Sequence, residues 1–233
     1  MEQRRDSATA YIILADGFET IEALTPLDVL RRCGVEVTTI SLNKTRAVRS
    51  SHGVTVEADA TMEDFMHNCN CCASAIGTGN AGTSSSADNA GTSSSAGSST
   101  TASSANTTAG SCLRQALILP GGYPGYKNLC ESAEVGALIT QFHKEGKLLC
   151  AICGAPTALK ANQICRGAAI TCHTSVKEEL SDYYSILSSA VVKYMNIITG
   201  MGAGRSLDFA FAIAEALTSK EKVEEIKAKM EII

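Results

Sequence analysis

Short apolar runs alternate with stretches of helical periodicity along most of the chain. Runs rich in large apolar or β-branched side chains predict buried strands at residues 11–15, 35–42, 116–119, 148–152, 169–171 and 196–199. Helical spacing of apolar side chains predicts helices at residues 21–30, 135–144 and 206–219. This alternation predicts an α/β fold, with a mostly parallel sheet and helices on both faces.

The composition changes sharply in the middle of the chain. Residues 73–111 are almost entirely Ser, Thr, Ala, Gly and Asn, and the sequence NAGTSSSA occurs twice, at 80–87 and 89–96. A segment with so few large apolar side chains cannot offset the entropy lost on ordering, so we expect a disordered insertion. We also expect residues 1–10 to be disordered and residues 11–233 to form a single domain that the insertion interrupts.

The overall composition argues against several classes of partner. The chain has 233 residues, of which 45% are hydrophobic and 19% charged, and its formal net charge is −4 at pH 7. Because Lys and Arg form no cluster, the charge pattern gives no reason to expect nucleic acid or an anionic membrane surface as a partner. The first apolar run is too short for an export signal or a membrane span, and the ten cysteines do not frame short loops. We therefore expect a cytoplasmic protein with reduced thiols.

The stretch KLLCAICGAPTALKA places Cys153 between a predicted strand and a predicted helix whose first turn contains Pro156. The positive end of a helix dipole lowers a cysteine pKa, and Gly154 and Ala155 leave room for a strained turn that exposes a nucleophile. Free cysteines are more often small buried hydrophobes, and the local pattern leaves both interpretations open. Cys150 lies inside the strand, so a C-x-x-C redox pair is disfavoured.

Other candidate groups also follow the ends of predicted strands. They are the turn at residues 16–19, the Pro-Gly-Gly at residues 120–122, and His173. Because the carboxyl ends of parallel strands meet at one edge of a sheet, we expect these groups to lie near Cys153. Backbone N–H groups of the Gly-Gly pair and of Gly154 would there form an oxyanion hole.

Two acidic residues begin the first predicted helix. Glu22 lies between Ile21 and Ala23, where partial burial would raise the pKa of its carboxyl group. A protonated Glu22 would donate a hydrogen bond to a thiolate and take part in proton transfer. Glu19 and Glu22 also suit an ordinary helix N-terminus, and the pattern alone leaves that alternative open.

Five segments between about residue 11 and residue 217 carry a specific set of motifs: ADGFETIEALTPLDVLRRCGVEVT, LILPGGYPGYKNLCES, AICGAPTAL, ITCHTSVKEEL and GMGAGRSLDFAFAIAEAL. Together they resemble the ThiJ/PfpI superfamily, in the branch of the Parkinson's-disease-associated protein deglycase and its bacterial relatives. The resemblance implies a flavodoxin-like α/β sandwich, similar to class I glutamine amidotransferases. It also implies a homodimer with the first helix at the interface.

The resemblance implies roles for Cys153 and for the residues expected to lie near it. Cys153 matches the nucleophilic, easily oxidised cysteine, Glu22 the buried acid that faces it, and His173 the nearby histidine. Gly122 and Gly154 match the residues whose amides bind an oxyanion. The family's peptidase members have histidine directly after the cysteine, so Gly154 removes the most specific support for a peptidase.

Further residues match the family's substrate pocket and dimer boundary. Gly202 and Ala203 match a loop that approaches the partner's active site, and Glu19 lies beside the pocket. Arg32 matches a pocket arginine at the dimer boundary, whereas the companion arginine is replaced by His52. This replacement weakens the case for an anionic pocket carried over from the family.

The resemblance implies a cofactor-independent glyoxalase or deglycase. Its substrates would be methylglyoxal, glyoxal and early aldehyde adducts of proteins or nucleotides, and nothing in the sequence requires a metal, a nucleotide or glutathione. The main alternative is an oxidative-stress sensor or chaperone that signals through oxidation of Cys153. A third alternative is a non-catalytic member of the fold that only scaffolds partners.

Overall fold

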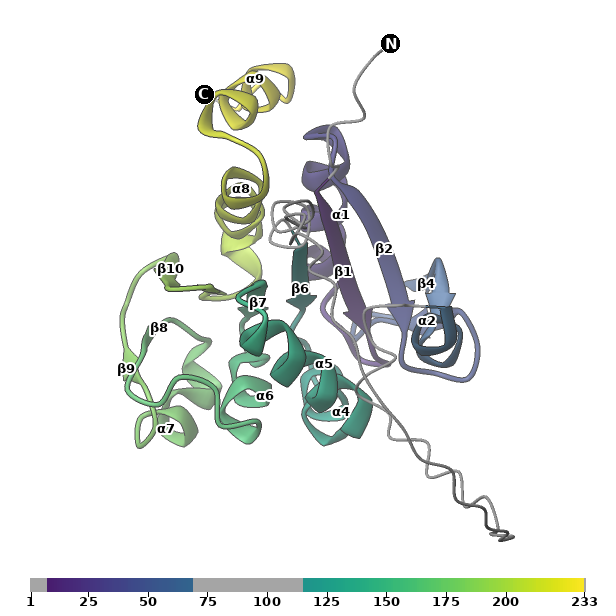
Figure 1. Cartoon of the computed structure of the whole chain (residues 1–233), viewed down its shortest axis with the longest axis vertical. Coiled ribbons are helices and arrows are strands. Elements are labelled where there is room, and N and C mark those ends of the chain that lie inside the picture. The colour runs from purple at the N-terminus through teal and green to yellow at the C-terminus, as the bar shows by residue number, and fades with distance from the viewer. Residues whose placement is uncertain (1–7, 69–114, 233) are drawn as a thin grey trace, which may run out of the picture.

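The computed structural model describes residues 8–68 and 115–232, and within them the main sheet has seven strands (Figure 1). Their order is β10-β11-β7-β6-β1-β2-β5, and all neighbours are parallel except β10, which runs antiparallel to β11. The strands are β1 (Thr9–Leu14), β2 (Glu36–Ser41), β5 (Ala60–Thr61), β6 (Gln115–Leu119), β7 (Leu148–Ile152), β10 (Val191–Tyr194) and β11 (Ile197–Gly200). The predicted α/β class with a mostly parallel sheet is confirmed.

Two short ribbons lie beside the main sheet. β3 (Ala47–Arg49) pairs antiparallel with β4 (Thr55–Glu57), and β8 (Ala169–Ile170) pairs parallel with β9 (Ser185–Ile186). The strand predicted at residues 169–171 therefore forms, but outside the main sheet. Apolar content alone does not distinguish a strand of a central sheet from a strand of a side ribbon.

Helices cover both faces of the sheet, with α1 packed against α8 on one face and α5 and α6 on the other (Figure 1). The helices are α1 (Thr20–Arg32), α2 (Met62–Asn68), α4 (Gly125–Glu131), α5 (Ala133–Lys144), α6 (Pro156–Ala161), α7 (Lys177–Leu180), α8 (Ser206–Leu217) and α9 (Lys220–Lys229). Two 3₁₀ turns, η1 (Thr174–Val176) and η2 (Ala203–Arg205), precede α7 and α8.

Alternate residues of each strand enter opposite apolar cores. In β1, Ile12 packs in the core that contains Phe209 of α8, whereas Ile13 packs in the core that contains Phe142 of α5. All four side chains are almost completely buried. Because side chains alternate across a strand, a strand covered on both faces must be apolar throughout, and this explains the unbroken apolar runs in the sequence.

The ends of the described segments bear on two expectations. β1 begins at Thr9, which pairs with both β2 and β6, so the expectation that residues 1–10 are disordered is wrong for residues 9 and 10. Sheet pairing holds Thr9, which is polar, and Ala10, which directly precedes the apolar run at residues 11–15. The insertion expected at residues 73–111 lies outside the described residues.

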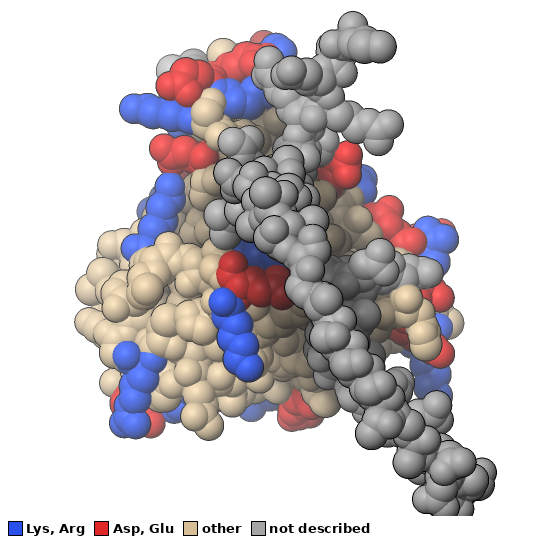
Figure 2. All heavy atoms as spheres, in the orientation of Figure 1, with Lys and Arg blue, Asp and Glu red and all other residues tan. Residues whose placement is uncertain are grey.

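The surface carries charges of both signs. On the face shown in Figure 2, Lys and Arg side chains alternate with Asp and Glu, and no large area of one sign is visible. Within the described part of the chain, no helix is long and apolar enough to cross a membrane.

Candidate active site

Cys153 directly follows β7 and adopts a left-handed backbone conformation with φ of 64°. Non-glycine residues rarely adopt this conformation, and the surrounding structure must hold it in place. Cys153 N donates a hydrogen bond to Gly200 O of β11 (3.0 Å), and Cys153 O accepts one from His173 N (2.9 Å). The expected strand–helix elbow is therefore present, and neighbouring segments fix it on both sides.

Glu22, in the first turn of α1, is completely buried and faces the cysteine. Its Oε2 accepts a hydrogen bond from Gly121 N (2.8 Å), and its Oε1 has no hydrogen-bond partner of good geometry. A Cβ atom on Gly121 would lie 2.6 Å from Glu22 Oε2 and 3.1 Å from Cys153 Sγ. The carboxyl group and the thiol can therefore approach each other only because residue 121 has no side chain.

The pKa of Glu22 is raised to about 7, mainly by burial and to a smaller extent by the nearby charge of Glu19. The Gly121 amide and the Cys153 thiol act in the opposite direction, but they do not outweigh the loss of solvent. At neutral pH the Glu22 carboxyl group is thus present in both protonated and ionised forms. This is the property that a group needs for moving protons at neutral pH.

Burial also raises the pKa of the Cys153 thiol, and the negative charge of Glu22 raises it further. The sequence predicted the opposite direction, from the dipole of the following helix. That helix begins only at Pro156, and the desolvation of a buried thiolate is the larger effect. Because Glu22 and Cys153 are coupled, a proton that moves from the thiol to the carboxylate leaves the charge of the pair unchanged.

Two backbone amides donate hydrogen bonds toward Cys153 Sγ, those of Gly122 and Gly154, and both lower the pKa of the thiol. Gly122 has φ of 89°, and a Cβ atom there would overlap the backbone of Gly17 and Glu19. Only glycine therefore fits at residue 122. The Pro-Gly-Gly pattern alone did not say which amide faces the cysteine, whereas the family resemblance implied Gly122; the Gly121 amide donates to Glu22 instead.

Each donating peptide is also held at its carbonyl end. Gly121 O, in the same peptide as Gly122 N, accepts a hydrogen bond from Glu19 N (2.9 Å). Cys153 O, in the same peptide as Gly154 N, accepts from His173 N (2.9 Å). In a trans peptide the N–H and C=O groups point in opposite directions, so a donor behind the carbonyl aligns the N–H with the sulfur.

One ring nitrogen of His173, Nδ1, is held by a local hydrogen bond. Nδ1 accepts a hydrogen bond from Ser175 N (3.2 Å), so the His173 side chain caps η1, and Nδ1 also lies 2.8 Å from Ser175 Oγ. The ring lies near Gly202, where an added Cβ atom would be 3.5 Å from His173 Cδ2. Since Nδ1 is an acceptor, the proton of the neutral ring is on Nε2, and His173 is suited to donate a hydrogen bond.

A cavity of about 840 Å³ opens above Cys153. It is lined by Glu19, Glu22, Ser51, His52, Gly122, Tyr123, Cys153, His173, Met201, Gly202, Ala203, Gly204 and Arg205. Most of the candidate residues therefore converge on one cavity. The sequence analysis missed Ser51, Tyr123, Met201, Gly204 and Arg205. Their positions directly beside candidate residues were the available signal.

Arg32 does not line this cavity in the single chain. It lies at the C-terminal end of α1, ten residues and therefore about 15 Å along the helix from Glu22, and its Nε donates to Asp28 Oδ2 (2.8 Å). Arg205 is the cationic side chain at the cavity, and it pairs with Asp208 at 3.6 Å. The expected pocket role of Arg32 is thus not seen within one chain, while His52 is placed as expected.

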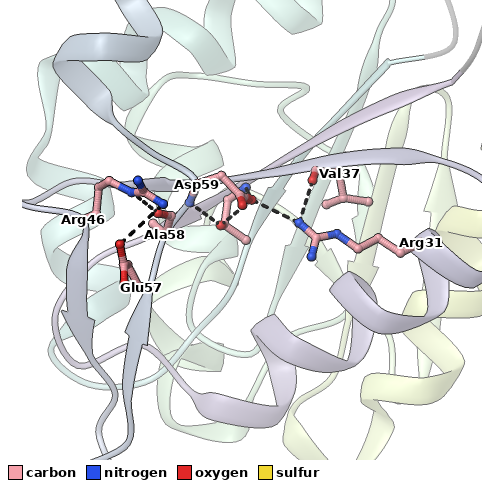
Figure 3. Close-up of polar contacts among 7 residues, drawn as sticks. Arg31, Val37, Arg46, Glu57, Ala58 and Asp59 are labelled. Atoms are coloured by element: carbon pink, nitrogen blue, oxygen red, sulfur yellow. Dashed lines mark hydrogen bonds and ion pairs between the residues drawn. The ribbon is translucent and has the colours of Figure 1, made fainter.

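The loop between β3 and β4 brings Ser51 and His52 to the cavity, and an ionic network holds the base of this ribbon (Figure 3). Asp59 Oδ2 accepts hydrogen bonds from Thr39 N (2.8 Å), Thr39 Oγ1 (2.8 Å) and Arg31 Nη2 (3.1 Å). Partial burial works to raise the pKa of Asp59, but these hydrogen bonds and the charge of Arg31 outweigh it, so the pKa is below its ordinary value.

Within residues 8–68 and 115–232, no group of three or more His, Cys, Asp and Glu side chains is arranged to hold a metal ion. The polar groups at the cavity include the Cys153 thiol, the buried carboxyl group of Glu22, two histidines and the amide of Gly122. This set can form a covalent adduct with a carbonyl compound and move protons on it.

The fold and the site define a class of α/β proteins in which a cysteine at a strand–helix elbow faces a buried glutamate. The chain belongs to the DJ-1/PfpI family, whose family model matches residues 8–92 and 83–216. It is 32% identical over 221 residues to Protein dj-1beta of Drosophila melanogaster, an alignment that covers 94% of this chain and 95% of that protein. The crystal structure of Drosophila melanogaster DJ-1beta superposes with a TM-score of 0.75 at 30% identity, covering 97% of this chain and 99% of that one.

A relative with a named activity matches a part of the chain. The glutathione-independent glyoxalase DJR-1.2 of Caenorhabditis elegans is 38% identical over 107 residues, which cover 46% of this chain and 56% of that protein. The Parkinson disease protein 7 homolog of Danio rerio is 30% identical over 223 residues, which cover 95% of each chain.

Proposed function

We propose that this protein is a cofactor-independent glyoxalase that converts small 2-oxoaldehydes, such as methylglyoxal and glyoxal, to 2-hydroxy acids. One observation carries the proposal: Cys153 and the buried carboxyl group of Glu22 line one cavity, and the amides of Gly122 and Gly154 donate toward the Cys153 sulfur. The similarity to a glutathione-independent glyoxalase supports it.

The first step forms a covalent adduct. The Cys153 thiol gives its proton to the Glu22 carboxylate, and the thiolate attacks the aldehyde carbon of methylglyoxal to form a hemithioacetal. The negative charge that develops on the former aldehyde oxygen lies beside the amides of Gly122 and Gly154, which stabilise it. Because the thiolate and the oxyanion both form next to these amides, the same donors serve before and after the attack.

The second step moves a proton between two carbons. Glu22 passes the thiol proton to the oxyanion, and the ionised Glu22 then removes the proton from the former aldehyde carbon. The electron pair forms an enediolate, and its negatively charged former ketone oxygen takes the proton of the adjacent hydroxyl group. Glu22 then returns a proton to the neighbouring carbon, which leaves a thioester of lactate on Cys153. Water hydrolyses the thioester, so methylglyoxal and one water become lactate and the free thiol is restored.

His173 assists at the second carbonyl group. Its Nδ1 is held by Ser175, so its Nε2–H donates to the ketone oxygen of the adduct and stabilises the enediol. Glu22 is then the group that transfers the proton. The Ser175 contact thus favours a role of His173 as a hydrogen-bond donor.

The same steps extend to early aldehyde adducts on Cys, Lys or Arg side chains and on nucleotides. Tyr123 at the cavity is 68% exposed, so the cavity communicates with solvent on that side. A protein-bound or nucleotide-bound hemithioacetal or aminocarbinol would reach Cys153 from this opening. We propose this deglycase activity as an extension of the glyoxalase reaction.

The experiment that tests the glyoxalase proposal is product analysis with methylglyoxal in the absence of glutathione. The wild-type protein is expected to release lactate in amounts far above the protein concentration, and Cys153→Ser is expected to release none. Equal turnover by the wild type and Cys153→Ser would overturn the proposal.

A sensor or chaperone that works through oxidation of Cys153 is the second candidate, and one observation favours it. Glu22 Oε1 is buried without a well-aligned partner beside the thiol, so a protonated Glu22 would donate to a sulfinate oxygen on Cys153. For this candidate, mass spectrometry would detect two added oxygens on Cys153 at low peroxide, in a protein that does not turn over methylglyoxal.

We further propose a homodimer that works in the cytoplasm. Ile21 on α1 and Val54 beside the cavity loop are 48% and 45% exposed, and exposed apolar side chains next to a functional cavity suit a protein interface. The six cysteines within the described residues are free thiols, which suits a reducing compartment. Light scattering is expected to give twice the chain mass of 24.3 kDa, and cell fractionation checks the location.

A further inference from the structure

Tyr126 contacts both glycines whose amides face Cys153. It lies in the first turn of α4 and is partly buried against the core that contains α5. Its N–H donates a hydrogen bond to Gly122 O (2.9 Å). Its ring lies against Gly154, where an added Cβ atom would be 2.7, 2.8 and 2.9 Å from ring atoms Cδ1, Cγ and Cε1. We infer that Tyr126 is a positioning residue that holds the two oxyanion-binding amides in place.

Space, and not backbone conformation, explains the glycine at residue 154. Gly122 has a positive φ, whereas Gly154 is outside the left-handed region, so an alanine would be free to adopt its conformation. The Tyr126 ring instead occupies the position that the alanine methyl group would need. The ring and the missing methyl group are therefore complementary, and each substitution alone disturbs the packing.

Tyr126 contacts positions that the hydrogen bonds from Glu19 N and His173 N do not restrain. Glu19 N and His173 N hold the carbonyl groups directly behind the two donating amides. Tyr126 restrains the following peptide of Gly122 and one side of the Gly154 Cα atom. Without the ring, Gly154 is free to move sideways, and its amide moves away from the sulfur.

The complementarity predicts a reciprocal rescue, measured as kcat and KM with methylglyoxal, and this part of the test rests on the proposed glyoxalase function. We expect Tyr126→Ala and Gly154→Ala each to lower kcat about tenfold with little change in KM, because misplaced donors affect the transition state most. The double variant Tyr126→Ala/Gly154→Ala is expected to return to within about threefold of the wild type, since the methyl group fills part of the vacated space.

Two further variants separate positioning from general stability. The hydroxyl group of Tyr126 has no hydrogen bond within the described residues, so Tyr126→Phe should keep the wild-type kcat. Tyr194→Ala, which removes a partly exposed tyrosine of β10 that does not line the cavity, is the matched control and should also keep it. Thermal unfolding of each variant identifies any loss that comes from misfolding.

A second readout does not depend on the glyoxalase proposal. The rate of Cys153 alkylation by iodoacetamide is measured against pH, with the other thiols monitored separately by peptide mass spectrometry. The Gly154 amide lowers the pKa of the thiol, and the Tyr126 ring packs against Gly154. Tyr126→Ala should therefore shift the alkylation profile to higher pH, and the double variant should shift it back.

The outcomes distinguish failure of the inference from failure of the proposed function. A wild type that makes no lactate, with the expected alkylation shifts, removes the glyoxalase proposal and keeps the positioning role. Losses in the double variant that equal or exceed the product of the single losses, with no return of the alkylation profile, overturn the inference. A Tyr126→Phe variant as impaired as Tyr126→Ala would also overturn it, because the argument rests on the ring.

Discussion

At the scale of single residues, the central feature is a thiol and a carboxyl group that share one cavity floor and one negative charge. Burial raises the pKa of both Glu22 and Cys153, and the charge of Glu22 raises the pKa of Cys153 further. The protonation of one group therefore depends on the other. Gly121 makes their approach possible, because any side chain there would overlap both. The position of one hydrogen atom separates the reactive form, with the thiolate and a protonated carboxyl group, from the resting form.

This coupling predicts the pH dependence of the reaction. Below the raised pKa of Glu22, about 7, both groups hold their protons and the thiolate is scarce. Activity should therefore rise with pH as the pair loses its first proton, with a midpoint near 7. The test is kcat/KM for methylglyoxal measured at several pH values on both sides of 7, because its pH dependence reports the pKa values of the free enzyme. A midpoint near the ordinary carboxyl pKa of 4.5 would contradict the coupling.

At the scale of elements, the site is assembled from the ends of strands and the loops that follow them. β7 supplies Cys153, the loop after β6 supplies Gly122, and α1 supplies Glu22 from its first turn. His173 arrives from outside the main sheet, after β8 of a side ribbon, and its backbone hydrogen bond to Cys153 O places it. The β3–β4 ribbon supplies His52 from a loop whose base is held by Asp59.

The ribbon network predicts a pH-dependent stability effect. Because the pKa of Asp59 is lowered in the folded state, its contribution is present above the unfolded pKa of about 3.9 and is lost as pH falls through the lower folded value. Asp59→Asn should lower the free energy of unfolding by about 0.5–1 kcal/mol at pH 7, a figure that allows for solvent screening of a half-exposed group. Denaturant unfolding at several pH values should show this difference shrinking below about pH 4.

Glu57→Gln is the matched control in the same ribbon. Glu57 is 74% exposed and lies 3.5 Å from Arg46, so its removal should change the unfolding free energy by less than about 0.5 kcal/mol. If Asp59→Asn and Glu57→Gln behave alike, or if the Asp59→Asn difference persists unchanged in acid, the network does not stabilise the ribbon as described.

The helices and strands also show how much of the fold can be predicted from the sequence. The apolar runs predict the central strands and the elbow at Cys153, because continuous burial requires continuous apolar side chains. They do not reveal that β8 leaves the main sheet or that Arg32 lies about three turns away from the acid. The contact between Tyr126 and Gly154 joins residues on different elements, and only the three-dimensional packing shows why residue 154 has no side chain.

At the scale of the whole molecule, the fold places one cavity at the carboxyl edge of a sheet that both cores support. Six segments from distant parts of the chain meet there. The face shown in Figure 2 carries charges of both signs. The family assignment agrees with this arrangement.

The measurement that tests the central claim most directly is the rate of lactate formation from methylglyoxal by Glu22→Gln, at neutral pH and without glutathione. Glutamine keeps the size of the side chain but cannot accept or return a proton, so the rate should fall at least about 100-fold while thermal unfolding stays near that of the wild type. A folded Glu22→Gln variant that forms lactate within about threefold of the wild-type rate would contradict the proton-transfer role of Glu22.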